Sequence, residues 1–254
     1  MPCIVALPAH IRKGMQSKPT VLITGASSGI GLALTKGFLK EGYRVVANSR
    51  RVTSAGTLTA SPSLALVDGD VAHPATAAKL VDTAVRQFGG LDVLVNNAGI
   101  FVPKAFDEYS SDDFQRVLDT NVTGFFHVTQ QAVRQMKKQG GGQVLTITTT
   151  LAGQPVAGVN AALTSLTKGG LNAVTKGLAM EYAGSGIRFN AIAPGIVDTP
   201  MHRVEDHAAL QGLHPIRRLG TVEEIVDAAL FLVKAPFITG EVLHVDGGAH
   251  AGKW

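Results

Sequence analysis

The feature that most constrains the fold is a glycine-rich turn between an apolar run and a helical pattern, in residues 20–34 with the sequence TVLITGASSGIGLAL. The run before the turn is typical of a buried strand, and apolar residues at helical spacing follow the turn. Gly25, Gly29 and Gly31 carry no Cβ atom, so a pyrophosphate can approach the N–H groups at the helix start. Because the spacing G-x3-G-x-G is not the general dinucleotide fingerprint, an ordinary glycine turn remains the alternative.

Predicted strands and helices alternate from residue 20 onward, and no linker divides the chain. We expect strands at residues 20–24, 44–49, 64–68, 91–96, 142–148, 187–192 and 242–246, and helices at residues 29–41, 75–88, 111–138, 160–183 and 221–234. Strands joined by helical crossovers form a parallel sheet covered on both faces. The predicted fold is therefore α/β, a three-layer doubly wound parallel sheet of seven strands in a single domain over residues 19–254.

Residues 1–18 precede this pattern and are expected to form a flexible extension, with Met15 as an alternative start. Their short apolar patch is interrupted by Pro8 and followed by positive charges, which fits neither a signal peptide nor a membrane span. The single cysteine, Cys3, excludes an internal disulfide and favours a reducing compartment. We therefore predict a cytoplasmic protein.

The composition narrows the classes of partner. Only 17% of residues are charged, and the basic residues behind the net charge of +4 are scattered, so no nucleic-acid surface is expected. Residues 139–167 carry no charge, but their Thr, Asn, Gln and Gly content excludes a membrane span. The eight histidines show no metal-binding spacing, so no metal is expected.

Ligands of such a sheet bind where the strands end. After the second predicted strand stand Ser49 and Arg50, where an enzyme specific for NAD would carry an acidic residue. A guanidinium group suits the additional phosphate of NADP, so we expect NADP(H) as the preferred cofactor and NAD(H) as the alternative. A solvated basic loop is the other interpretation. Asp70 and Val71 follow the third strand and suit an adenine edge, although aspartate is also common in turns.

Several motifs together resemble the short-chain dehydrogenase/reductase family, in its branch of about 250 residues. They are TGASSGIG at 24–31, DV at 70–71, NNAG at 96–99, the NV step at 121–122, NAIAPG at 190–195 with Thr199, and TGEVLHVDGG at 239–248. The resemblance covers residues 19–250 and implies the fold predicted above. The expected cofactor-binding residues are Gly25, Ser27, Ile30, Gly31, Ser49, Arg50, Asp70, Val71, Asn97, Ala98, Gly99, Lys168, Pro194, Gly195 and Thr199.

The same resemblance implies hydride transfer between a nicotinamide and a carbonyl or alcohol. The family uses a Ser, a Tyr, a Lys four residues after the Tyr, and a supporting Asn. Here Lys168 matches the lysine and Asn121 the asparagine, but Thr164 stands at the tyrosine position and Thr150 at the serine position. A threonine hydroxyl is a much weaker acid than a phenol. We therefore expect the proton to come from Lys168, or from water ordered by Thr150, Thr164 and Asn121.

Three functions remain open. The first is an NAD(P)-dependent oxidoreductase acting on a small carbonyl or alcohol, with an atypical catalytic site. The second is a non-catalytic dinucleotide-binding subunit or sensor, and the third is an enzyme of elimination or isomerisation. Helices 111–138 and 160–183 carry apolar residues on more than one face; in the resembled family these helices pair between subunits, so we expect a homotetramer.

Residues 201–219 occupy the place of the family's variable substrate loop. The basic side chains of this segment are compatible with an anionic or polar substrate, or with a solvated mobile lid. They are His202, Arg203, His207, His214, Arg217 and Arg218.

Overall fold

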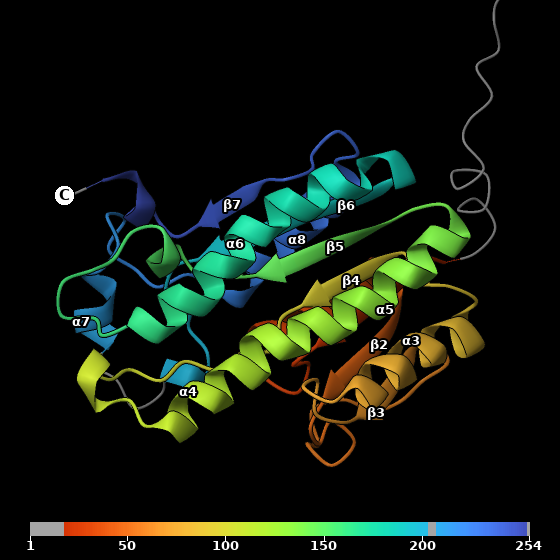
Figure 1. Ribbon diagram of the computed structural model, residues 1–254, viewed down its shortest axis with the longest axis horizontal. Helices are drawn as coiled ribbons and strands as arrows, with labels where there is room; N and C mark the ends of the chain where they lie inside the picture. The colour runs from red at the N-terminus through yellow and green to blue at the C-terminus, as the bar shows by residue number, and fades with distance from the viewer. Residues whose placement is uncertain (1–17, 203–206, 253–254) are drawn as a thin grey trace, which may run out of the picture.

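The computed structural model describes residues 18–202 and 207–252, and these residues form a seven-stranded parallel sheet between two layers of helices (Figure 1). The strand order is β3-β2-β1-β4-β5-β6-β7, so the winding reverses between β1 and β4. The strands are β1 (Thr20–Thr24), β2 (Arg44–Ser49), β3 (Leu64–Asp68), β4 (Val93–Asn96), β5 (Gly142–Ile147), β6 (Ile187–Pro194) and β7 (Val242–Val245). The predicted doubly wound α/β sheet is confirmed.

Helices cover both faces of the sheet. Helices α2 (Gly29–Lys40) and α8 (Val222–Lys234) pack on one face, and α3 (Pro74–Phe88), α5 (Gly124–Gln139) and α6 (Ala162–Tyr182) pack on the other. In Figure 1, α5 and α6 run in front of the sheet and α8 lies behind it. Each layer encloses its own hydrophobic core.

Strand β1 contributes to both cores because successive side chains of a strand point to opposite faces. Val21 and Ile23 belong to the core beneath α2 and α8, and Leu22 belongs to the core beneath α3 and α5. All three are fully buried. This two-sided burial explains why β1 is a continuous apolar run without polar alternation.

The predicted helix over residues 111–138 is one helical column with an irregular centre. It comprises α4 (Ser111–Leu118), a π turn η2 (Asp119–Thr123) and α5. A π turn holds one more residue than an α-helical turn, and such turns are frequent at functional sites. Here the turn contains Asn121, which is buried.

Other boundaries differ by one or two residues from the prediction. Strand β4 begins at Val93, and the backbone N–H and C=O of Leu91 bind the side chain of Gln139. Helix α6 begins at Ala162 because Ala161 has a non-helical backbone, with φ at −123°. Residues 1–17, most of the predicted extension, lie outside the described residues.

The predicted substrate loop contains short helices, η5 (Pro200–His202) and α7 (His207–Gln211). Residues 139–167 comprise the last residue of α5, β5, a loop with the short helix η3 (Thr150–Ala152), and the start of α6. No helix in the described part of the chain has the length and apolar character to cross a bilayer.

Candidate active site

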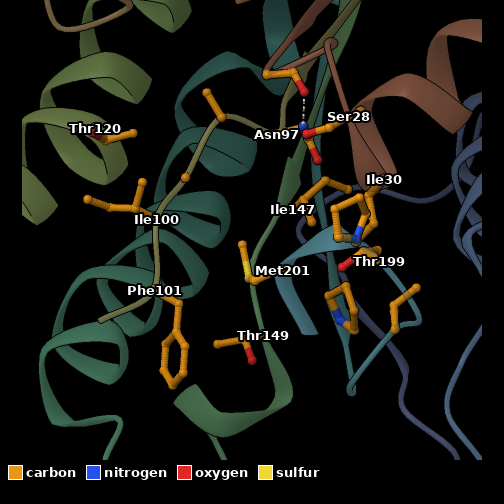
Figure 2. Close-up of a pocket in the computed structure, with 18 of the residues that line it drawn as sticks. Ser28, Ile30, Asn97, Ile100, Phe101, Thr120, Ile147, Thr149, Thr199 and Met201 are labelled. Atoms are coloured by element: carbon orange, nitrogen blue, oxygen red, sulfur yellow. Dashed lines mark hydrogen bonds between the residues drawn. The ribbon is translucent and has the colours of Figure 1, made fainter. Parts of the chain in front are cut away.

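The loops that follow the strands enclose a cavity of about 980 Å³ at the carboxyl edge of the sheet. In Figure 2, Ser28 and Ile30 lie toward one end of this cavity, and Phe101 and Thr149 lie toward the other. Every residue predicted to bind cofactor lines it, as do Thr150, Thr164 and Lys168. Asn121 is the one predicted site residue that does not line this cavity.

The glycine turn presents the start of α2 to the cavity. The N-cap residue Ser28 makes no side-chain capping bond, and the first turn of α2 has no acidic residue. The backbone N–H groups of this first turn are therefore open to an anion. The glycines have an additional role that the sequence did not indicate. A Cβ on Gly31 would lie 2.2 Å from the carbonyl oxygen of Gly25, and one on Gly25 would lie 2.8 Å from Asn97 Nδ2. The lack of a Cβ at Gly25 and at Gly31 therefore allows neighbouring segments of the protein to pack closely. A Cβ on Gly29 would make only ordinary van der Waals contacts.

Asn97 and Ala98 are fixed to the end of β1. The Asn97 amide nitrogen donates to the carbonyl oxygens of Thr24 and Gly25 at 2.9 and 3.2 Å. The backbone N–H groups of Asn97 and Ala98 both donate to Thr24 Oγ1 at 3.0 Å. These bonds hold the backbone before Gly99 against the end of β1, and a Cβ on Gly99 would lie 3.0 Å from Lys168 Nζ.

The end of β2 is basic. Ser49 and Arg50 line the cavity, and Arg50 forms no ion pair with a carboxylate of the described residues. The acid opposite Ser49 in the sheet is Asp68. It accepts hydrogen bonds from the backbone N–H and the hydroxyl of Thr53, and it does not line the cavity. The carboxylate nearest to Ser49 in the sheet is thus held outside the cavity.

Lys168 and Thr164 lie one turn apart on the buried side of α6. Lys168 is only 8% exposed, and its Nζ donates to the carbonyl oxygen of Ile147 at 2.8 Å. Burial lowers the pKa of Lys168 to about 8. Thr164 is 6% exposed, and its hydroxyl has no hydrogen-bond partner in the protein. None of the chain's three tyrosines lines the cavity.

Thr150 contacts a residue that the sequence analysis did not single out. Its hydroxyl donates to Asp246 Oδ2 at 2.6 Å. Asp246 directly follows β7 and lies in the TGEVLHVDGG motif at 239–248, so it was visible as part of a motif. Its pairing with a hydroxyl 96 residues earlier was not visible, because it depends on how β5, β6 and β7 pack.

Asn121 supports the cavity from outside. Its Oδ1 accepts from the N–H of Ile100 at 2.9 Å, and its Nδ2 donates to the Ile100 carbonyl oxygen at 3.1 Å and to Thr167 Oγ1 at 3.3 Å. The side chain thus holds the loop after β4 against the π turn and α6. These bonds use the amide group of Asn121 to join three segments, and its part in ordering a catalytic water stays a prediction.

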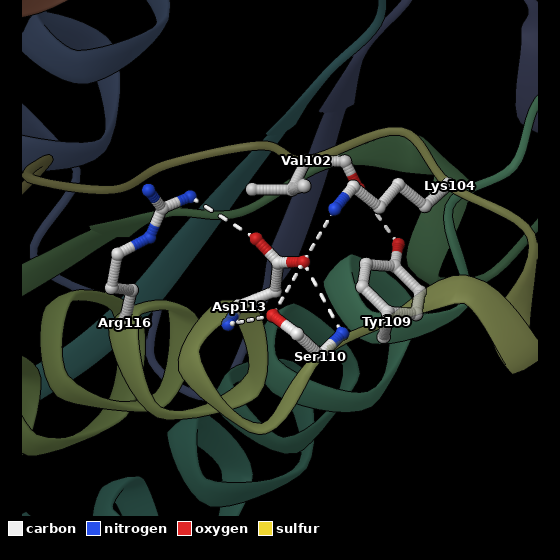
Figure 3. Close-up of polar contacts among 6 residues, drawn as sticks. All are labelled: Val102, Lys104, Tyr109, Ser110, Asp113 and Arg116. Carbon is white, nitrogen blue, oxygen red and sulfur yellow. Dashed lines mark hydrogen bonds and ion pairs between the residues drawn. The ribbon is translucent and has the colours of Figure 1, made fainter.

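A second network holds the same loop farther along (Figure 3). The carboxylate of Asp113, at the start of α4, accepts from Lys104 Nζ at 2.6 Å and from the Ser110 hydroxyl at 3.0 Å, and Arg116 lies 3.4 Å away. The Tyr109 hydroxyl donates to the carbonyl oxygen of Val102 at 2.7 Å. This tyrosine is therefore bound away from the cavity.

The cavity wall beyond Lys168 is mostly apolar. Its side chains come from the loops after β4 and β5 and from the segment before α8. The last of these was expected, because residues 201–219 were predicted to form the substrate loop, but sequence reasoning missed the others because isolated apolar residues in loops carry no chemical signal. They are Ile100, Phe101, Leu151, Val156, Val159, Met201 and Leu213.

The basic residues of the substrate loop contribute little to this wall. His202 and His214 line the cavity, but His214 is buried, its Nε2 accepts from the N–H of Ile196 at 2.9 Å, and burial lowers its pKa. Arg218 forms an ion pair with Glu224 instead, and Arg217 is not a cavity residue. Arg203 and the side chain of His207 lie outside the described residues.

The chain matches known proteins over nearly its full length. The family described as "Enoyl-(Acyl carrier protein) reductase" matches residues 25–250. The chain is 36% identical to 3beta-hydroxysteroid dehydrogenase 1 of Eggerthella lenta, over 90% of this chain and 92% of that protein.

Solved structures agree. The fold is similar to a gluconate 5-dehydrogenase of Burkholderia cenocepacia in complex with NADP and tartrate, with a TM-score of 0.86, 32% identity, and coverage of 93% of this chain and 97% of that one. It is also similar to a 3-ketoacyl-(acyl-carrier-protein) reductase of Brucella melitensis complexed with NADH, with a TM-score of 0.86, 32% identity, and coverage of 92% and 99%. On this evidence the chain belongs to the short-chain dehydrogenase/reductase family, whose characterised relatives are oxidoreductases that bind nicotinamide dinucleotides.

Proposed function

We propose that this protein is an NADP(H)-dependent oxidoreductase that transfers hydride between the cofactor and an uncharged carbonyl or alcohol substrate, in an active site in which Thr164 replaces the family's tyrosine. The observation that carries the proposal is a buried lysine beside an unpartnered hydroxyl, in a cavity that also contains an open helix N-terminus. We also propose a cytoplasmic location, as the single cysteine suggests.

The residues of the cavity fit a phosphorylated dinucleotide. The uncapped start of α2 suits the pyrophosphate. Arg50 suits the ribose phosphate because it has no carboxylate partner in the described residues, and Asp70 and Val71 suit the adenine. When bound, NADPH supplies the hydride.

Lys168 is the group best placed to donate a proton and to stabilise negative charge on the substrate. With a pKa of about 8 it is largely an ammonium ion at neutral pH, close enough to neutrality to act as a general acid. A cation in a buried site also stabilises the negative charge that develops on a carbonyl oxygen during reduction. Its bond to Ile147 uses one of three N–H groups, so the others can serve the substrate or the ribose.

The apolar wall supports a bulky, uncharged substrate. Such walls bind apolar ligands through burial of surface, with a few polar groups that fix orientation. The relative from Eggerthella lenta is named for hydroxysteroids, which are ligands of this character. An anionic substrate is the weaker hypothesis, because the arginines at 217 and 218 do not line the cavity.

Turnover of three proteins tests this proposal: wild type, Thr164→Tyr and Lys168→Ala. NADPH oxidation is followed with cyclohexanone, decalone, benzaldehyde and, as an anionic comparison, pyruvate. We expect wild type to favour the uncharged ketones, with reduction falling above about pH 8 as Lys168 loses its proton. The rate of carbonyl reduction by Lys168→Ala should be lower than that of wild type by about a hundredfold or more, which is the usual effect of removing a general acid.

Thr164→Tyr should raise reduction about tenfold or more, because a phenol is a better-matched acid than an aliphatic hydroxyl. Cofactor affinity is measured alongside for all three proteins. If all bind NADPH alike and none reduces any carbonyl, the enzymatic proposal fails and a non-catalytic dinucleotide-binding protein becomes the better account.

A further inference from the structure

The carboxylate of Asp246, which does not itself line the cavity, accepts several hydrogen bonds. Its side chain is only 2% exposed. Oδ2 accepts from Thr150 Oγ1 at 2.6 Å and from the backbone N–H of His250 at 2.9 Å, and Oδ1 accepts from the N–H of Gly248 at 3.0 Å. The ring nitrogen Nδ1 of His250 lies 2.9 to 3.0 Å from both oxygens.

These donors keep Asp246 ionised. Burial raises the pKa of Asp246, but the hydrogen bonds from Thr150 and His250 outweigh it, and the pKa lies below its ordinary value. The other titratable groups nearby are His244, which stacks on the His250 ring, and His214, whose pKa burial lowers. An ionised carboxylate accepts hydrogen bonds and donates none.

The consequence concerns the hydroxyl of Thr150. A hydroxyl has one hydrogen and two lone pairs. Because the hydrogen is bound by Asp246, Thr150 can offer the cavity only a lone pair. Donors that the described residues still offer to the cavity include the unpartnered hydroxyl of Thr164 and the free N–H groups of Lys168.

We propose that Asp246 is a positioning residue that sets the hydrogen-bond polarity of the reacting end of the cavity: it makes Thr150 an acceptor, which binds the hydroxyl of an alcohol and gives no hydrogen bond to a carbonyl oxygen. The carbonyl oxygen is bound by Lys168 and Thr164. This inference rests on the proposed function for its ligands, but the orientation of the Thr150 hydroxyl is testable without any substrate.

The first experiment measures that orientation in the full-length protein. Aspartate labelled at the side-chain carboxyl is titrated by NMR in wild type, Thr150→Val and Thr150→Ser. Removing a donor should raise the pKa of Asp246 in Thr150→Val, whereas Thr150→Ser keeps the donor and should titrate as wild type does. An unchanged pKa in Thr150→Val would show that Thr150 does not donate to Asp246, and the inference would be wrong.

The second experiment measures the consequence for ligands. Cyclohexanol and cyclohexanone are bound to the complex with tetrahydro-NADP, a redox-inert cofactor analogue, so both affinities refer to the same unreactive state. Thr150→Val should weaken the binding of cyclohexanol about fivefold, which is a typical net contribution of one hydrogen bond. The affinity for cyclohexanone should stay unchanged. Weakening of cyclohexanone instead would identify Thr150 as a donor to the carbonyl and overturn the proposal.

The Asp246→Asn variant isolates the positioning role. An asparagine amide can donate to Thr150, which frees the threonine hydrogen for the cavity. The affinity ratio of alcohol to ketone should then fall about fivefold or more, and the substitution should have no such effect in a Thr150→Val background. Failure of both ligands to bind wild type would count against the proposed function, while the carboxyl titration would still decide this inference.

Discussion

Lys168 is a cation enclosed by protein without a carboxylate partner in the described residues. Its neighbours are the carbonyl oxygen of Ile147 and the cavity. Burial of an unpaired charge disfavours the charged form, which is why the pKa of Lys168 falls from its ordinary value of 10.5 to about 8. The site therefore holds a group that costs folding free energy, as is common for catalytic residues.

The linked prediction is that Lys168→Met stabilises the protein at pH 7. Between pH 8 and 10.5 the unfolded lysine binds more protons than the folded one, so wild-type stability rises with pH across this window. Each pKa unit corresponds to about 1.4 kcal/mol, so the buried ammonium costs about 3 kcal/mol at pH 7. Urea unfolding at pH 7 and pH 10 measures both effects; wild-type stability that is flat across the window would contradict the assignment.

Arg50 carries a separate prediction at the residue scale. Wild type should bind NADPH more tightly than NADH in a fluorescence titration, because Arg50 meets the additional phosphate without a competing carboxylate. Arg50→Gln should weaken NADPH about tenfold and leave NADH unchanged. Arg86→Gln, an exposed arginine on α3 outside the cavity, is the matched control. Equal affinities of wild type for the two cofactors would remove the basis for the NADP assignment.

Residues at strand ends were predictable because motif and position agree. A glycine turn, an amide and a basic residue directly after parallel strands must meet at one edge, and the structure places Gly25, Asn97 and Arg50 around one cavity. The partner of Thr150 could not be predicted, since a hydroxyl gives no sign of whether it faces a ligand or a carboxylate. The unpartnered state of Thr164 likewise depends on packing.

At the scale of elements, the column from α4 to α5 shows what periodicity can and cannot detect. Apolar spacing predicts a helix over residues 111–138 correctly, but a π turn adds only one residue to one turn and leaves that spacing nearly intact. Within the turn, Asn121 makes tertiary hydrogen bonds to Ile100 and Thr167, which apolar spacing cannot reveal. The start of α4 is local: Ser110 and Asp113 form a capping box that the sequence encodes directly.

Asp113 gives the prediction for this element. Hydrogen bonds from Lys104 and then Ser110 lower the pKa of Asp113 to about 2. A depressed carboxyl pKa stabilises the fold above the unfolded value of 3.8, and this contribution is lost as pH falls toward 2. Asp113→Asn should therefore destabilise the protein at pH 7 and by progressively less below pH 4, measured by thermal unfolding.

The matched control is Asp112→Asn, which changes an exposed carboxylate on the same helix turn. It should leave stability nearly unchanged, because exposed charges contribute little. If both variants lose stability equally, the effect comes from the helix dipole and not from the network around Asp113. Amide exchange at Ile100 and Phe101 in Asp113→Asn further reports whether this network holds the cavity wall.

At the scale of the whole molecule, helices cover both faces of the sheet, yet large apolar side chains of these helices remain exposed. In α5 and α6, Phe126, Leu166 and Met180 are 54%, 60% and 82% exposed. Val128, Val133 and Leu171 of the same helices are buried in the monomer. These helices therefore have an inner apolar face that the sheet covers and outer apolar residues that no other part of the described chain covers, which is typical of an interaction surface.

We predict that a second copy of the chain covers these residues and that the protein is a homotetramer, because these two helices pair between subunits in the family that the chain resembles and soluble homo-oligomers usually have closed symmetry. Light scattering at micromolar concentration should give four times the mass of one chain. Phe126→Arg or Leu166→Arg should reduce the assembly to smaller species, because each places a charge in the contact. Phe106→Arg is the matched control, an exposed phenylalanine in the short helix η1 (Phe106–Glu108) outside both helices, and it should stay tetrameric. A monomeric wild type would show that the protein forms no such contact. An assembly that persists with arginine at both helix positions would show that the contact lies elsewhere.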